Sequence, residues 1–167
     1  EGRRWLEAAL ALPQTDKLTA ARAKALCGAG RFAIRLGDAA VGRSLLEEGV
    51  ALYRKLGDKQ GLAESLIMWE ANSRNASLSV RPQLEESVVL AREAGDKWTL
   101  ANSLQDLGWF ILGHNDPDEA RPLLEKSAAI FRELGDTHSL ISVLTALTRT
   151  AADQENLAQA ETLAQEC

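Results

Sequence analysis

Apolar residues recur every three to four positions along most of the chain, and polar residues fill the positions between them. The pattern is clearest from Trp98 to Asp136. The first apolar face there is made by Leu100, Leu104, Leu107 and Ile111, and the second by Ala120, Leu123, Leu124, Ala128, Phe131 and Leu134. This spacing predicts two helices, because positions three and four apart share one side of a helix. Neither helix can bury its stripe alone, so the pair is expected to pack against similar pairs.

The residues between and after these two stripes predict tight helix ends. Gly113 and Asn115 tolerate left-handed backbone, Asp116 suits an N-cap, and Pro117 suits the first turn of a helix. Gly135 is expected to end the second helix as a C-cap glycine. Ala101 and Gly108 are small, which allows a neighbouring helix to approach closely.

The same plan recurs on the N-terminal side of this segment. The dipeptides Gly57-Asp58, Gly95-Asp96 and Gly135-Asp136 are separated by 38 and 40 residues. The helix starts Leu46-Glu47-Glu48, Leu84-Glu85-Glu86 and Leu124-Glu125-Lys126 follow the same spacing. Turn, helix start and apolar spacing therefore repeat together, which predicts an all-α chain of stacked helical hairpins.

This unit resembles a tetratricopeptide repeat. The slots of the family's pattern are filled here by Leu104, Leu107, Gly108, Ile111, Ala120 and Leu124. Two features depart from the family: the period exceeds its usual length of about 34 residues, and the proline near the repeat end is absent. The resemblance implies a right-handed superhelix of antiparallel helix pairs, a single domain over 1–167 with about four repeats. Their expected bounds are 16–58, 59–96, 97–136 and 137–167, with 1–12 ending a preceding repeat.

Individual elements follow from the same signals. A helix is expected over 17–36 with Thr15 or Asp16 as its N-cap, and a partner helix over 39–56. We expect Leu36, Tyr53, Leu56 and Leu134 to face inward, and Trp69 and Trp98 to pack between helices. The polar segment 72–82 precedes a short helix over 82–94; it is either a functional loop or a tolerated insertion.

Composition narrows the function classes. The net charge of −5 argues against direct nucleic-acid binding by this segment, and the apolar runs are too short to span a membrane. Cys27 and Cys167 form no disulfide framework or metal motif, and His114 and His138 lack a nearby second ligand. No nucleophile–base pair or phosphate loop is suggested by spacing, so we expect no enzyme, no cofactor and no metal. Because the chain lacks an initiating Met, it is interpreted as part of a longer protein.

The resemblance also implies where a ligand would bind, because first helices line the concave face in that family. The positions carried over by the pattern are Lys24, Cys27, Arg31, Arg35, Glu64, Ile67, Ala71, Arg74, Asn75, Asn102, Gln105, Trp109, Leu112, Ser142, Thr145 and Arg149. The predicted binding residues among them are Lys24, Arg31, Arg35, Arg74, Asn75, Asn102, Gln105, Trp109 and Arg149.

The chemistry of this set suits an extended peptide or a partner protein. Side-chain amides such as Asn102 and Gln105 can pair with a peptide backbone, and arginines can bind carboxylates or phosphates. Trp109 offers an apolar platform. The competing interpretation is solvated charges or ion pairs for the arginines and core packing for Trp109.

Long repeats that end in Leu-Gly-Asp resemble the sensor regions of bacterial transcriptional regulators of the LuxR and maltose-regulator type, and of related signalling ATPases. This resemblance implies a non-catalytic peptide- or protein-binding module in a cytoplasmic bacterial regulator. Two alternatives stay open. One is a structural module that forms a homodimer through terminal helices, using Leu157 and Leu163 or Trp5 and Leu6; the other is a sensor of a small, sugar-like ligand.

Overall fold

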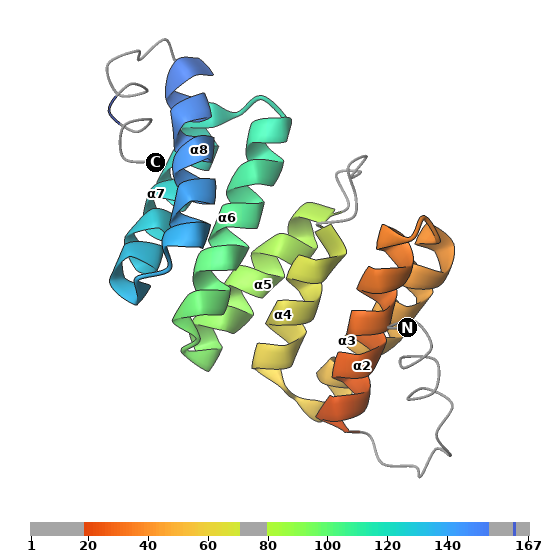
Figure 1. Cartoon of the computed structure of the whole chain (residues 1–167). Helices are drawn as coiled ribbons and strands as arrows, with labels where there is room; N and C mark the ends of the chain where they lie inside the picture. The colour runs from red at the N-terminus through yellow and green to blue at the C-terminus, as the bar shows by residue number, and fades with distance from the viewer. Residues whose placement is uncertain (1–18, 71–79, 154–161, 163–167) are drawn as a thin grey trace. The chain divides into compact units, whose positions relative to one another are not determined.

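The computed structural model describes residues 19–70, 80–153 and 162, and every element it assigns there is helical (Figure 1). The helices are α2 (Ala20–Arg35), α3 (Ala39–Leu56), α4 (Lys59–Glu70), α5 (Arg81–Ala94), α6 (Lys97–Gly113), α7 (Pro117–Leu134) and α8 (Thr137–Asp153). The all-α prediction is confirmed for this part of the chain. The helices expected over 39–56 and 82–94 lie at, or within one residue of, those bounds.

The chain divides into two compact units, residues 1–94 and 95–167. In the first unit, α2 pairs with α3 and α4 pairs with α5, and α4 also packs against α2 and α3. In the second unit, α7 packs against both α6 and α8. Each unit therefore contains the helical hairpins that the repeated pattern predicts.

The five turns that the structure describes, which are all those between α2 and α8 except the α4–α5 connection, follow one design. Each has a residue with positive φ, from 62° at Asn115 to 93° at Gly37, followed by an aspartate. The aspartate side chain then accepts a hydrogen bond from the backbone N–H three residues later, as Asp116 does from Glu119 at 3.0 Å. Gly135 takes the left-handed conformation after α7. The predicted roles of Asn115, Asp116 and Gly135 are confirmed.

The core of the first unit lies between α2, α3 and α4. It is built from Ala23, Leu26, Cys27, Leu46, Val50, Leu52, Tyr53, Leu62 and Leu66. Backbone approaches backbone where α2 crosses α3, since a Cβ added to Gly30 would lie 2.7 Å from the Gly42 carbonyl oxygen. Glycine at both positions allows the two helices to pack this closely.

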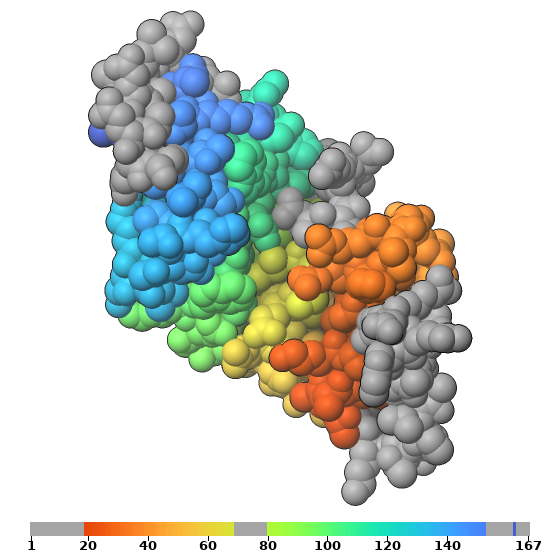
Figure 2. All heavy atoms as spheres, viewed as in Figure 1, coloured from red at the N-terminus to blue at the C-terminus, as the bar shows by residue number. Residues whose placement is uncertain are grey.

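The core of the second unit is centred on α7, with Leu124 and Phe131 fully buried. A Cβ added to Gly108 would lie 2.7 Å from the Leu124 side chain, which confirms that Gly108 permits close helix packing. The Ser127 hydroxyl donates a hydrogen bond to the Ala101 carbonyl at 2.7 Å and so joins α7 to α6. In the space-filling view, the atoms of α8 form one continuous surface with those of α7 (Figure 2).

Some local predictions were wrong. The helix expected from residue 17 begins at Ala20, and its N-cap is Thr19, not Thr15 or Asp16; Thr19 accepts a hydrogen bond from the Arg22 N–H at 3.2 Å. The leucines expected to face inward at helix ends are instead exposed, by 59% at Leu36, 36% at Leu56 and 42% at Leu134. Each of these three is the last residue before a left-handed glycine, at the very end of its helix.

Trp98 is the other correction, because 51% of the residue is exposed. It lies in the first turn of α6, and its Nε1–H donates a hydrogen bond to Asp136 Oδ2 at 3.0 Å. Its role is therefore a polar contact at the surface of the second unit. The side chain of Trp69 lies outside the described part of the chain.

Candidate functional site

The predicted binding residues of the second unit lie on α6 and α8. We call the surface made by Asn102, Gln105, Trp109, Ser142, Thr145 and Arg149 the α6–α8 face. The Gln105 Nε2–H donates a hydrogen bond to Ser142 Oγ at 3.0 Å, which joins the two helices at this face. The Arg149 Nη2 lies 3.5 Å from the Leu112 carbonyl oxygen, a second contact between α8 and α6. The structure thus brings together residues that lie 37 positions apart in the sequence.

Other polar groups of this face are used within their own helices. The Asn102 amide donates to the Trp98 carbonyl at 2.9 Å, and the Thr145 hydroxyl donates to the Ile141 carbonyl at 2.8 Å. Trp109 is half-buried, as an aromatic platform beside a core would be. The binding role of these residues stays a prediction.

Gln105 differs from its neighbours in one respect. Its Oε1 is buried and has no hydrogen-bond partner within the part of the chain that the structure describes. A buried acceptor without a partner costs about 1–3 kcal/mol. The Gln105–Ser142 pair is therefore only half satisfied, and a ligand at this face could pair with the Gln105 oxygen only after the amide rotates toward it.

The predicted binding residues of the first unit are only partly described. Lys24, Arg31 and Arg35 lie on α2 with exposed side chains. Arg74 and Asn75 lie outside the described residues, as does most of the polar segment 72–82. The terminal residues proposed for a homodimer, Trp5, Leu6, Leu157 and Leu163, lie outside them as well.

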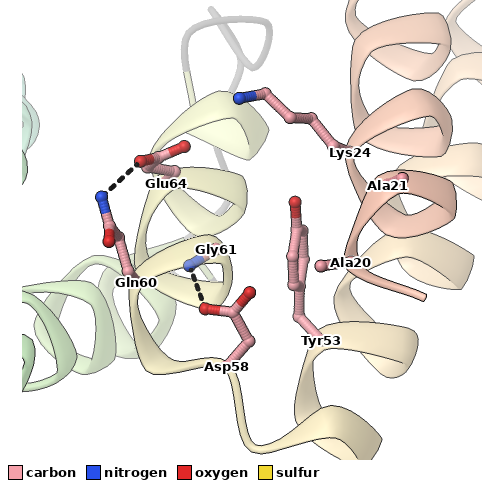
Figure 3. A pocket seen from close by; sticks show the side chains of 8 residues that line it. All are labelled: Ala20, Ala21, Lys24, Tyr53, Asp58, Gln60, Gly61 and Glu64. Carbon is pink, nitrogen blue, oxygen red and sulfur yellow. Dashed lines mark hydrogen bonds between the residues drawn. The ribbon is translucent and has the colours of Figure 1, made fainter. Parts of the chain in front are cut away.

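A cleft that the sequence did not predict lies beside Lys24. It has a volume of about 300 Å³ and opens between the first turns of α2 and α4 (Figure 3). It is lined by Ala20, Ala21, Lys24, Tyr53, Asp58, Gln60, Gly61 and Glu64. Lys24 and Glu64 were both carried over from the family pattern, but Tyr53 was expected only as a core residue. The sequence signal for the place of the Tyr53 ring is Gly61. A Cβ added to Gly61 would lie 2.1 Å from that ring, so glycine leaves the room that the ring occupies.

Burial raises the pKa of two side chains in the first unit. The pKa of Cys27 rises from 9.0 to about 11, chiefly through burial of the thiol, and a hydrogen bond with Ser65 opposes this shift. The pKa of Tyr53 rises from 10.0 to about 12, chiefly through burial and then through the nearby Cys27, Asp58 and Glu64. A thiol with a raised pKa is a poor nucleophile at neutral pH, so Cys27 is a packing residue.

We expect the stability of the first unit to fall as pH rises from about 9 to about 11, because of Cys27. The unfolded chain releases the thiol proton near pH 9, while the folded chain keeps it until about pH 11. The unfolded state therefore binds fewer protons in this window, and the loss is about 2 kcal/mol. Urea unfolding at both pH values should show this loss in the wild type and a smaller one in Cys27→Ala. Equal pH dependence in the two proteins would contradict the assignment.

Two features of the described residues bear on other classes of function. No group of three or more His, Cys, Asp or Glu side chains there is arranged to hold a metal ion. No described helix is long and apolar enough to cross a membrane.

Comparison with known proteins identifies the fold. The chain is similar to the crystal structure of Rap protein complexed with competence and sporulation factor, with a TM-score of 0.84 and 14% sequence identity. The match covers 98% of this chain and 45% of that one, so the chain spans less than half the length of that protein. No protein-family model matches the chain, and no curated protein matches it in sequence. At this identity the likeness concerns the fold alone, and it confirms a tetratricopeptide-like helical repeat.

Proposed function

We propose that this chain is a non-catalytic tetratricopeptide-type module that binds an extended peptide, or an extended segment of a partner protein, on the α6–α8 face. The observation that carries the proposal is the half-satisfied Gln105–Ser142 pair at the junction of α6 and α8. A peptide backbone offers both an N–H donor and a C=O acceptor. A rotation of the Gln105 amide toward a peptide breaks one hydrogen bond and can form two.

The neighbouring side chains support the same class of ligand. Arg149 supplies a cation that can bind a carboxylate or a carbonyl of the peptide, and Trp109 supplies an apolar surface for a side chain. The similar Rap protein was crystallised in complex with competence and sporulation factor, which supports a binding role for a fold of this type. We further propose that the module belongs to a larger cytoplasmic bacterial transcriptional regulator. Neighbouring ATPase and DNA-binding domains in the full-length protein would test this context.

A displayed random-peptide library, selected on the purified chain, tests the binding site. We expect each of the variants Gln105→Ala, Trp109→Ala and Arg149→Ala to bind the selected peptide about tenfold more weakly, which corresponds to about 1.4 kcal/mol of binding free energy. Arg132→Ala on α7 is the matched control, since it removes the same side chain from a second helix. Circular dichroism should show the same helical content in all four variants.

Two results would overturn this proposal. One is a selected peptide whose affinity does not change in any of the three face variants. The other is a selection that enriches no peptide at all over the background obtained with an unrelated helical protein.

A further inference from the structure

The cleft of the first unit is separate from the α6–α8 face and has the features of a small-molecule site. Its volume of about 300 Å³ lies at the lower end of the range for ligand pockets. All of its lining residues come from α2, from the end of α3, and from α4 with the turn before it. The cleft is therefore formed within one compact unit.

Tyr53 forms the centre of the cleft. The residue is only 5% exposed, and Gly61 leaves room for its ring at a position where any side chain would collide with it. Figure 3 shows the hydroxyl directed into the space between Lys24 and Glu64. No described residue forms a hydrogen bond with this hydroxyl. The ring is buried, but the hydroxyl reaches the open space of the cleft, where it can donate a hydrogen bond to a bound molecule.

Opposite charges flank the hydroxyl. Lys24 reaches over the cleft from α2, and Glu64 stands on the opposite wall on α4 (Figure 3). Lys24 forms no ion pair with the described residues, and the partner of Glu64 among them is the Gln60 amide at 3.3 Å. Asp58 lies in the turn before α4, and its side chain already accepts a hydrogen bond from the Gly61 N–H at 2.9 Å. One cationic group and two carboxylates therefore face the cleft, and Lys24 is ion-paired with neither carboxylate.

We propose that this cleft binds a small zwitterion of the α-amino-acid type, with its carboxylate on Lys24 Nζ and the Tyr53 hydroxyl and its ammonium group on Glu64. A ligand with only an anionic group would be repelled by Glu64 and Asp58, and a ligand with only a cationic group would be repelled by Lys24. A zwitterion matches both walls and supplies the acceptor that the Tyr53 hydroxyl lacks. Each of its three hydrogen bonds has a charged donor or acceptor, and such bonds are of the stronger kind.

Thermal unfolding of the purified chain with each common L-amino acid, up to about 10 mM, tests the ligand class, because a ligand that binds only the folded state raises the melting temperature. At least one amino acid should stabilise the protein. Its N-acetyl derivative lacks the ammonium group and its amide lacks the carboxylate, and each should bind at least about tenfold more weakly by calorimetry. The proposal is overturned if no amino acid stabilises the chain, or if both derivatives bind as well as the parent.

Variants locate the site. Tyr53→Phe removes one oxygen and keeps the ring against Gly61, while Lys24→Gln and Glu64→Gln remove one charge each without changing the core. Each variant should bind the amino acid about tenfold more weakly. The control Glu47→Gln, on the exposed side of α3, should leave the affinity unchanged. If Tyr53→Phe loses helical content, the affinities of Lys24→Gln and Glu64→Gln for the amino acid test the site instead. Unchanged affinity in both would refute the site, and peptide binding at the α6–α8 face should not respond to either variant.

Discussion

Replacing Phe131 with alanine is expected to destabilise the second unit by about 3–5 kcal/mol, which is the usual cost of deleting a buried aromatic side chain. Phe131 is 0% exposed and lies on α7, the helix that packs against both α6 and α8. Its removal leaves a cavity in the core of the second unit, and the helix backbones cannot close it without losing other contacts. Urea unfolding followed by far-ultraviolet circular dichroism measures the change in the free energy of unfolding.

The matched control for this change is Phe32→Ala on α2. It deletes the same atoms from a residue that is 40% exposed, so we expect a loss of about 1 kcal/mol or less. The loss of stability caused by Phe131→Leu should fall between these two values, since leucine keeps most of the buried volume. Equal losses for Phe131→Ala and Phe32→Ala would contradict the packing of α7 described above.

The helix ends could be predicted from the sequence because their causes are local. Asn115, Asp116 and Gly135 act on backbone groups within three residues of themselves, and short segments contain all the partners involved. The exposure of Leu36 and Leu134 could not be read in this way. Both continue an apolar stripe, and how the neighbouring helices pack decides whether the end of that stripe is covered.

The candidate sites show the same division. The helical spacing alone predicts that Asn102, Gln105 and Trp109 lie along one line of α6. The hydrogen bond from Gln105 to Ser142 depends on how two hairpins pack, and no local signal specifies that contact. Tyr53 was expected in the core, and its ring is there. The direction of its hydroxyl depends on Gly61, which follows the next turn, so the cleft was missed.

Replacing Gly42 with alanine is expected to destabilise the first unit by about 2 kcal/mol or more, although alanine favours helices. The added Cβ would lie 2.3 Å from Ile34 Cγ1 and 2.6 Å from the Gly30 carbonyl oxygen. The Ile34 side chain can move, but the Gly30 carbonyl belongs to the backbone of α2. Relief of the second collision therefore requires α2 and α3 to separate.

Gly28→Ala provides a control of opposite sign. Gly28 also lies inside α2, but no heavy atom of the described residues, apart from its own helix backbone, lies within 4 Å of the added Cβ. The change should stabilise the chain by about 0.5–1 kcal/mol, because alanine loses less conformational entropy than glycine on helix formation. Thermal and urea unfolding of the two variants should thus move in opposite directions. If Gly42→Ala also stabilised the protein, helix propensity alone would account for both results, and α2 could not cross α3 as closely as Gly30 and Gly42 indicate.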